Sequence, residues 1–477
     1  MPTPPAATYS PRIYPLDPRH LTEEEIAVAF AMTSRRPEPF DEIAEQVSQE
    51  KAADFHERWV LGYGHASVAE HAVVHLAVEN ISRLACDSLE DNRLASYTEK
   101  SSRYQVMPKD YFHLPAELEK YPEARAAYLS TCQGLFAAYQ RLVGGCMEYL
   151  RGELPRRQGE RDGAYNLRLR RITTDVCRSV LPSATLTNVG LTANARVLEH
   201  AISKLMSSGL AEERAIGEQL REQGRVITPT LIKYADRNRY LEDSLQRDWQ
   251  LGFPAGAGVS TGPSTTVNLV HYDPEAEEKL AAAVLFRQSS GDYAGAWEQS
   301  RAMDPEDRCQ LIDSLMENLG DHDAPLREFE LMDYTFEYIM DYGAYREFKR
   351  HRMQSYFPQA LTVDLGYKTP ELIAEAGLEE DFRRAMEDSE EGFRSVSRDA
   401  PLAAQYLVTH GHYRRVLSKL NLRECYHLFK LRSSSEAHES IREPILEAMR
   451  LAVEVHPHLF RWLKLRDYPN WWPFPAQ

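Results

Sequence analysis

Apolar residues recur at helical spacing in two widely separated segments of the chain. In the first, E-E-E-I-A-V-A-F-A-M-T-S at residues 23–34, Ile26, Ala29 and Phe30 fall on one helical face. The second, E-E-K-L-A-A-A-V-L-F-R-Q-S-S at residues 277–290, has a similar pattern. We therefore predict a helix in each segment.

The two helices belong to a longer internal repeat. Asp17 matches Asp273 and Ser34 matches Ser290, and both pairs lie 256 residues apart. A constant offset across a whole element is typical of a repeated domain.

Residues 73–89 alternate imperfectly between apolar and polar and then turn helical, which predicts a strand followed by a helix.

Composition and charge narrow the class of protein. The chain has 477 residues, of which 43% are hydrophobic and 27% charged, as in globular chains of two or three domains. A net charge of −16 argues against general nucleic-acid binding. Six cysteines without C-x-x-C spacing argue against zinc and disulfides and fit a reducing compartment. Neither a signal peptide nor an apolar run of about 18 residues is present, so we expect a cytoplasmic protein that does not enter a membrane.

The polar stretch D-N-R-L-A-S-Y-T-E-K-S-S-R-Y at residues 91–104 is a candidate mononucleotide site. Arginine presents a fork of donors that suits phosphate. Serine hydroxyls and local backbone N–H groups can complete an anion cradle, and Glu99 can accept from a sugar hydroxyl or a ring N–H. The alternative is a polar surface turn with incidental charges.

A second stretch, K-R-H-R-M-Q-S-Y-F-P-Q-A-L at residues 349–361, aligns with the first. At an offset of 259, Arg352 corresponds to Arg93 and Ser355 to Ser96. The first copy lacks an Arg-His pair, and the second lacks the downstream glutamate, serine and arginine. Together they resemble the R-H-R-x7-S signature of the flavin-dependent thymidylate synthases, and the rest of the chain can be read as two copies of that domain.

Residues 64–71, G-H-A-S-V-A-E-H, resemble the family's G-H-x-[ST]-x-x-E-H segment, with a counterpart expected at residues 321–325. Two histidines beside a glutamate could suggest a metal site. No third ligand is spaced to complete it, so we expect no metal. For Ser67 the sequence leaves two interpretations open, a contact to flavin or a polar helix start.

Three further motifs resemble those of the family. R-S-V-L-P at residues 178–182 resembles A-R-x-x-L-P, and the L-R at Arg432 resembles L-R-x-x-x-x-A-x-x-E-I. N-A-R at residues 194–196 and N-L-R at residues 421–423 resemble N-x-R, at an offset of 227. The fall of the offset from 259 to 227 implies that the second copy lacks roughly thirty residues in its middle.

The resemblance implies an α+β fold. Each of two tandem thymidylate-synthase-complementing-like domains would contain an antiparallel sheet flanked by helices. The expected organisation is a flexible N-terminal arm at 1–12, a first domain at 13–240, a linker at 241–267, a second domain at 268–465, and an aromatic, proline-rich tail at 466–477.

The resemblance also implies a set of site residues. Arg432 would be the catalytic residue, because the family places this arginine on the uracil ring. The dUMP-binding residues would be Glu99, Ser101, Ser102, Arg103, Arg178 and Arg432. The FAD-binding residues would be Ser67, Arg350, His351, Arg352, Asn194, Arg196, His200, Asn421, Arg423 and His427.

The implied reaction is the FAD-dependent methylation of dUMP to dTMP, with methylenetetrahydrofolate and NADPH as co-substrates. No cysteine nucleophile is used in this family, which agrees with the absence of a recognisably activated cysteine. Residues of both copies would form each site, and two chains would form a homodimer that resembles a tetramer of single domains. Neither nucleic acid nor a membrane is expected as a partner. Two alternatives stay open: a flavoprotein that modifies another pyrimidine nucleotide, and a non-catalytic scaffold or regulator that keeps the fold.

Overall fold

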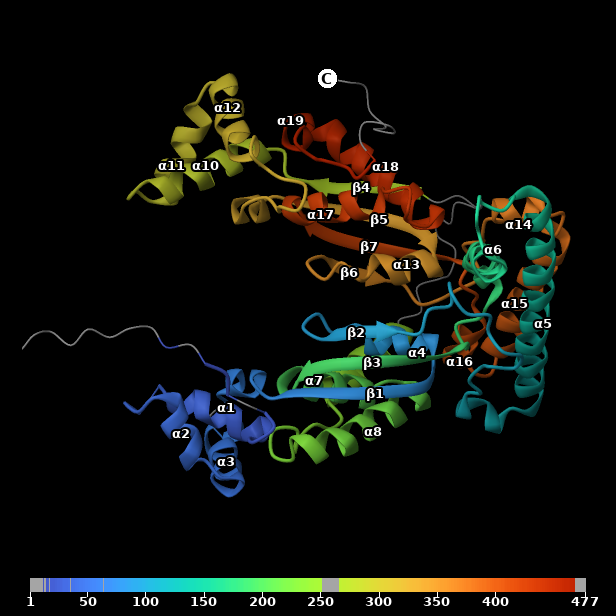
Figure 1. Cartoon of the computed structure of the whole chain (residues 1–477), viewed down its shortest axis with the longest axis horizontal. Coiled ribbons are helices and arrows are strands. Elements are labelled where there is room, and N and C mark those ends of the chain that lie inside the picture. The colour runs from blue at the N-terminus through green and yellow to red at the C-terminus, as the bar shows by residue number, and fades with distance from the viewer. Residues whose placement is uncertain are drawn as a thin grey trace, which may run out of the picture. The chain divides into compact units, whose positions relative to one another are not determined.

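Two antiparallel sheets organise the chain in the computed structural model, which describes residues 12, 14–16, 18–34, 36–62, 64–250 and 266–467 (Figure 1). The chain forms two compact units. Within the described part, the first unit comprises the ranges 1–81, 88–100 and 187–253, and the second comprises 82–87, 101–186 and 254–477. Segments from both halves of the sequence therefore contribute to the second unit.

The first unit contains a three-stranded sheet in the order β1-β3-β2. Strand β2 runs antiparallel to β3, with Ser96 opposite Thr192. The elements up to this sheet and the helices after it are α1 (Glu23–Met32), α2 (Phe40–Gln46), α3 (Gln49–Phe55), η1 (His56–Gly62), η2 (Ala66–Glu70), β1 (Val73–Ser82), β2 (Ser96–Glu99), β3 (Leu186–Asn194), α7 (Ala195–Met206), α8 (Ala211–Ile227) and α9 (Arg239–Gln250).

Local sequence explains how the first of these helices begins. Thr22 Oγ1 accepts from the Glu25 backbone N–H, and the Glu25 carboxylate accepts from the Thr22 backbone N–H, which is a capping box. Buried Ile26 and Ala29 lie on the inner face of α1. The predicted helix at residues 23–34 is confirmed.

The second unit contains a four-stranded sheet in the order β4-β5-β7-β6. Its elements are α4 (Arg83–Leu89), η3 (Ala116–Lys120), α5 (Pro122–Glu153), α6 (Asp162–Cys177), η4 (Arg178–Val180), β4 (Thr266–Tyr272), α10 (Ala276–Gln288), α11 (Tyr293–Ala302), α12 (Pro305–Met316), η5 (Arg327–Leu331), β5 (Asp333–Asp341), α13 (Tyr342–Phe348), β6 (Ser355–Pro358), α14 (Glu371–Glu375), α15 (Glu379–Ser397), α16 (Pro401–Ala404), η6 (Gln405–Leu407), β7 (Tyr413–Asn421), α17 (Leu422–Arg432), α18 (Glu439–Val455) and α19 (Pro457–Phe460). Two residues of α4, Ser88 and Leu89, belong to the first unit.

An alternating strand supplies the core of this sheet. Along β5, every second side chain is fully buried, namely Tyr334, Phe336, Tyr338 and Met340. Helix α18 packs against β4 and β5 through an apolar face that includes Ile441, Ile445 and Met449. Strand β5 pairs along its whole length with β7, from Asp333 opposite Asn421 to Asp341 opposite Tyr413. Burial of one sheet face under a helix fixes this register, because a slip by one residue would expose the aromatic set.

The main elements follow the same order in the two halves of the chain, although the first half has the additional helix α6 between α5 and β3 and the second half has the short helices α14 and α16 around α15. Strand, short helix, strand, long helix, strand and two helices occur as β1-α4-β2-α5-β3-α7-α8 and again as β5-α13-β6-α15-β7-α17-α18. The α+β fold predicted from the sequence is confirmed, as is the strand followed by a helix at residues 73–89.

Three of the predicted segments lie largely outside the part that the structure describes. They are the arm up to residue 11, residues 251–265 of the linker, and residues 468–477 of the tail. The linker was predicted to begin at residue 241, where the structure instead has helix α9 as far as Gln250. The domain boundaries stay a prediction. Among the described residues, no helix combines the length and apolarity needed to cross a membrane.

Candidate functional site

Three arginines converge on two carboxylates in the second unit. We call Arg103, Arg178 and Arg432, together with Glu347 and Asp175, the arginine cluster. Arg103 lies in the turn after β2, Arg178 begins η4 directly after α6, and Arg432 is the last residue of α17. Residues that are more than 300 positions apart in the sequence therefore form one site.

Asp175 is the closer of the two carboxylates to the arginines. Arg103 Nη2 donates to Asp175 Oδ2 at 2.7 Å, and Arg178 Nη2 lies 3.2 Å from Asp175 Oδ1. The turn that carries Arg103 is held in place, because Thr174 Oγ1 donates to the Arg103 backbone carbonyl at 2.6 Å. His438 Nε2 lies 3.9 Å from Asp175 Oδ1, from the N-cap position of α18.

Glu347 lies between all three guanidinium groups. Its Oε1 is 3.4 Å from Arg178 Nη2 and 3.9 Å from Arg103 Nη1, and its Oε2 is 3.4 Å from Arg432 Nη1. Burial alone would raise the pKa of the Glu347 carboxyl, but attraction from the three arginines outweighs burial and lowers that pKa. Glu347 is therefore an anion at neutral pH.

A hydrogen-bonded chain continues from Arg432 into the protein. Arg432 Nε donates to His351 Nε2 at 3.0 Å, and His351 Nδ1 lies 3.1 Å from Glu424 Oε1. Burial is the main cause of a lowered pKa of His351, so the ring is neutral. Since a guanidinium can only donate, Nε2 is the accepting nitrogen and the proton sits on Nδ1, where it is donated to Glu424.

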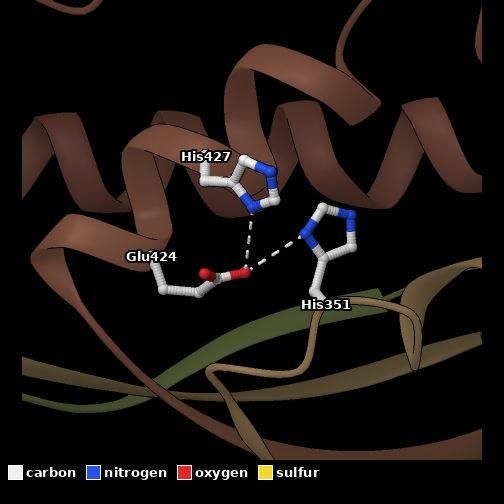
Figure 2. A group of neighbouring side chains, drawn as sticks. All are labelled: His351, Glu424 and His427. Atoms are coloured by element: carbon white, nitrogen blue, oxygen red, sulfur yellow. Dashed lines mark hydrogen bonds and ion pairs between the residues drawn. The ribbon is translucent and has the colours of Figure 1, made fainter. Parts of the chain in front are cut away.

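His427 completes this group at the surface. Figure 2 shows Glu424 and His427 projecting from one helix, α17, toward His351 in the loop before β6. Nitrogen and oxygen atoms of the three side chains lie within 4.8 Å of one another, a spacing that could hold a metal ion. A cation bound through His351 Nδ1 would have to displace the proton that this nitrogen donates to Glu424. The sequence-based expectation of no metal concerned a different segment, and it stays a prediction.

A pocket that is partly open to solvent adjoins the arginine cluster, with about 660 Å³ of empty space when the solvent at its mouth is included. Asp175 and Arg178 of the cluster belong to the pocket wall, and so does the neighbouring His438. The pocket wall also includes Lys368, whose ammonium lies 3.1 Å from Glu443 of α18. Open space therefore exists beside Arg178 of the cluster.

Comparison with known proteins identifies the family. The model of the family "Thymidylate synthase complementing protein" matches residues 19–230 and again residues 268–458. The chain belongs to this family. The double match confirms the expectation of two tandem copies of such a domain.

Relatives of two sizes match the chain. A UPF0159 protein of Chlamydia muridarum is 32% identical over 435 residues, covering 88% of this chain and 82% of that protein. A UPF0159 protein of Thermoplasma acidophilum is 28% identical and covers 88% of this chain and 91% of its own length. A flavin-dependent thymidylate synthase of Clostridium tetani is 24% identical over 214 residues, which are 44% of this chain and 82% of that enzyme.

A solved structure is also similar, the UMP/dUMP methylase PolB of Streptomyces cacaoi. It is 17% identical, and the match covers 42% of this chain and 95% of that chain. The TM-score of 0.36 is too low for this likeness to carry an argument.

The residues that the family resemblance implies for dUMP fall into two groups. Ser101, Ser102 and the three arginines lie in the second unit, where Ser101 Oγ accepts from the Arg103 backbone N–H at 3.2 Å. Ser102 is buried. Glu99 is the last residue of β2 and belongs to the first unit.

The R-H-R run places its three side chains differently. The turn between α13 and β6 exposes Arg350 and Arg352 and buries His351 between them. Only the two arginines thus present their charges to solvent, whereas the histidine faces Glu424 and Arg432.

The two N-x-R motifs of the family have the same structural roles. Asn194 Oδ1 accepts from the Val197 backbone N–H, and Asn421 Oδ1 accepts from the Glu424 backbone N–H, so that each asparagine caps its helix. Arg196 pairs with Glu70 at 2.5 Å, and His200 is exposed on the same helix.

The second motif corrects the sequence alignment of the repeat. Arg423 Nη1 pairs with Glu330 at 3.0 Å, as Arg196 pairs with Glu70. The counterpart of the segment at 64–71 is therefore η5 with its preceding residues, and the counterpart expected at 321–325 was wrong. Ser67 lies exposed on η2.

Sequence reasoning missed four residues in and around the cluster. Asp175 and Glu347 belong to it, Glu424 is linked to it through His351, and His438 lies beside Asp175. Only Asp175 had a local signal, because a residue three positions before an arginine on a helix lies next to it. The others meet the arginines only through the fold.

Proposed function

We propose that this chain methylates dUMP to dTMP as an FAD-dependent enzyme, with methylenetetrahydrofolate as the carbon donor and NADPH as the reductant. The single observation that carries the proposal is the arginine cluster. Three guanidinium groups, each from a segment that resembles a substrate segment of the family, lie around one carboxylate, and one of them, Arg178, lines a pocket. Flavin-dependent thymidylate synthases of Clostridium tetani and Geobacter sulfurreducens, 24% and 28% identical, support the reaction class.

Within this proposal, Arg103 and Arg178 hold the nucleotide phosphate, together with Ser101 and Ser102. Guanidinium forks match phosphate oxygens in geometry as well as in charge. Both arginines are only partly exposed, so the contacts would be less screened than those of surface side chains.

Arg432 is the residue that we assign to the uracil ring. A fixed cation at the ring edge stabilises negative charge that develops there during the reaction. The hydrogen bond to His351 fixes the Nε edge of the guanidinium, and the Nη groups remain to address the ligand and Glu347. Glu99 would accept from the sugar or the ring.

FAD would be held chiefly through the second copy of the signature. Arg350 and Arg352 are exposed, and their charge suits an anionic pyrophosphate. The remaining residues assigned to FAD are His351, Asn421, Arg423 and His427 of this half and Ser67, Asn194, Arg196 and His200 of the first half. When bound, FAD supplies the hydride chemistry, while the protein orients the reactants and excludes competing reactions.

The first copy is less suited to an anionic cofactor. Asp91 stands where the second copy has Arg350, and its carboxylate forms an ion pair with Lys204. We propose one FAD site per chain and a homodimer that resembles a tetramer of single domains.

The test begins with the visible absorption spectrum of the purified protein, followed by an assay for dTMP from dUMP. A flavin spectrum and dTMP formation that depends on methylenetetrahydrofolate would support the proposal. Arg103→Ala should abolish most of the activity, whereas Arg383→Ala, which removes an exposed arginine from α15, should not. A flavoprotein that makes no dTMP would instead modify another pyrimidine nucleotide. A protein that takes up no flavin would be a scaffold or regulator.

A further inference from the structure

Glu347 has an unusual position for a paired carboxylate. Its side chain is only 13% exposed, and three guanidinium groups approach it from separate segments. Its distances to the arginine nitrogens are 3.4, 3.4 and 3.9 Å. Charge-assisted hydrogen bonds between arginine and carboxylate are normally about 2.7–2.9 Å long. Glu347 is thus surrounded by donors without a close contact to any of the three.

This spacing suits an anion larger than a carboxylate. A carboxylate has two oxygens, and here it is shared among three guanidinium groups. A phosphate monoester presents three terminal oxygens and up to two negative charges, so it can offer one oxygen to each arginine. The cluster also contains Asp175, which makes the close 2.7 Å contact to Arg103 that Glu347 does not make.

The charges of the cluster lead to the same conclusion. Three arginines face two carboxylates, which leaves one net positive charge, and His438 lies at the edge. A phosphate dianion added to this set would make it net negative. Like charges in a shared, partly buried site repel each other strongly. Withdrawal or protonation of one carboxylate would lower this repulsion, and Glu347, whose contacts to the arginines are longer than that of Asp175, is the better candidate.

We propose that Glu347 is an internal anion that occupies the arginine cluster in place of a ligand phosphate, and that phosphate binding displaces it. The residue then sets the affinity and the selectivity of the site. Ligands without phosphate do not displace Glu347, whereas a phosphate monoester does. This inference rests on the proposed function in that it takes the cluster as the phosphate site of a nucleotide.

The residue is specific to one half of the chain. At the offset of 259 that relates α4 to α13, the position of Glu347 corresponds to Ser88. Ser88 Oγ donates to Glu213 and does not bring a carboxylate of its own. The internal anion is therefore present in the half that also carries Arg432.

The experiment compares wild type with Glu347→Gln, which keeps the shape of the side chain and removes its charge. Binding of inorganic phosphate, dUMP and deoxyuridine is measured by calorimetry on the full chain. We expect phosphate and dUMP to bind about tenfold more tightly to the variant, a ratio that corresponds to about 1.4 kcal/mol. Deoxyuridine, which lacks the phosphate, should bind equally to both proteins.

A matched control is Glu337→Gln. Glu337 also pairs with an arginine in the second unit, Arg415 at 2.8 Å, but lies on β5 outside the cluster. Its phosphate affinity should equal that of wild type. Without ligand, Glu347→Gln should melt below wild type because three cations lose a counter-ion, and phosphate should raise its melting temperature more than that of wild type.

Unchanged or weaker phosphate binding by a folded Glu347→Gln protein would overturn the inference, because Glu347 would then position the arginines rather than compete for them. Absence of phosphate binding in both proteins would overturn it as well. If Glu347→Gln does not fold, Glu347→Asp can replace it, because the shorter side chain draws the carboxylate back by one methylene. This variant should also bind phosphate and dUMP more tightly than wild type, by a smaller factor than Glu347→Gln. Phosphate binding that responds as expected, in a protein that makes no dTMP, would refute the proposed reaction and leave the inference standing.

Discussion

Replacement of Arg432 by lysine is a direct test of the catalytic assignment. The guanidinium makes two contacts, from Nε to His351 Nε2 at 3.0 Å and from Nη1 to Glu347 at 3.4 Å. Lysine keeps the positive charge but has one nitrogen instead of a planar fork. It cannot keep both contacts and also address a ring edge. We therefore expect Arg432→Lys to fold, to bind nucleotide and to turn over slowly.

The size of the effect follows from the surroundings of the two groups. The His351 side chain is 2% exposed, and an unsatisfied buried acceptor costs roughly 1–3 kcal/mol of stability. Arg432 itself is 21% exposed, so water can reach His351 Nε2 when the guanidinium is removed. We therefore expect a loss of stability in the lower half of the range of roughly 1–3 kcal/mol. Loss of a donor aimed at developing charge typically lowers kcat by about 10²–10³. The variant should lose much more activity than stability.

The assay measures kcat and KM for dUMP by dTMP formation, with circular dichroism and thermal unfolding as checks on the fold. Arg442→Lys is the control, because Arg442 is a nearby arginine on α18 that makes a long contact to a backbone carbonyl. A kcat for Arg432→Lys equal to that of wild type would refute the assignment of Arg432 to the ring. If unfolding at the assay temperature fully explained the fall in kcat, Arg432 would act on stability alone, and the claim that it contributes to catalysis separately from stability would be refuted.

Three further predictions concern the phosphate, the core and the flavin. Arg103→Ala should weaken dUMP binding by roughly 1.5–3 kcal/mol, the range for a charge-assisted contact, and leave FAD binding intact; equal losses of both ligands in titrations would contradict this assignment. Asp87→Asn should cost about 3–5 kcal/mol of unfolding free energy in denaturant titrations at pH 7, because Asp87 is the buried partner of Lys349. Burial raises the pKa of Asp87, but the nearby cations lower that pKa by more than burial raises it. The stability that the Asp87 ion pair contributes is therefore present above about pH 4 and is lost as the pH falls through the lowered pKa. The gap between variant and wild type should therefore narrow in acid, and a gap that is constant with pH would count against the ion pair. Titration of apoprotein with FAD should give one site per chain, lost in Arg350→Ala/Arg352→Ala, and two equivalent sites would refute the asymmetry of the copies.

Much of the fold could be predicted from the sequence because it rests on local patterns. The helix at 23–34 has its apolar spacing and its capping residues within twelve positions. The N-x-R motif likewise places an asparagine before a helix, where the side chain caps the first turn at residues 194 and 421. Such features depend on neighbours in the chain. The helix at 23–34 was predicted from its pattern, whereas the two asparagines were expected as FAD-binding residues and their capping role comes from the structure.

The make-up of the candidate site could be predicted only in part, because it depends on contacts across the fold. Arg103, Arg178 and Arg432 were found through motifs, but their shared carboxylate was not. Nothing in the E-F-K-R-H-R sequence distinguishes Glu347 from a surface residue of a charged helix end. The counterpart segment at 321–325 was misplaced for a related reason, since a histidine was matched by spacing, whereas the pairing of Arg423 with Glu330 marks the equivalent position.

The hydrogen bonds that connect Arg432, His351 and Glu424 explain why the two halves of the protein differ at all three of these positions together and not at one of them alone. At the offsets of the repeat, the corresponding residues of the first half are Leu205, Asn92 and Val197. A buried carboxylate without its hydrogen-bonded partner, or a partly buried arginine without an acceptor, costs several kcal/mol, whereas an apolar pair at the same positions costs little. Each single exchange between the halves would therefore be unfavourable, and the three positions are expected to change together. Leu205→Arg alone should thus destabilise the first half, because Leu205 is buried and the counterparts of the acceptor pair supply no counter-charge. Asn92 offers only a neutral amide oxygen and Val197 offers no acceptor, whereas Arg432 donates to His351, which is backed by the Glu424 carboxylate.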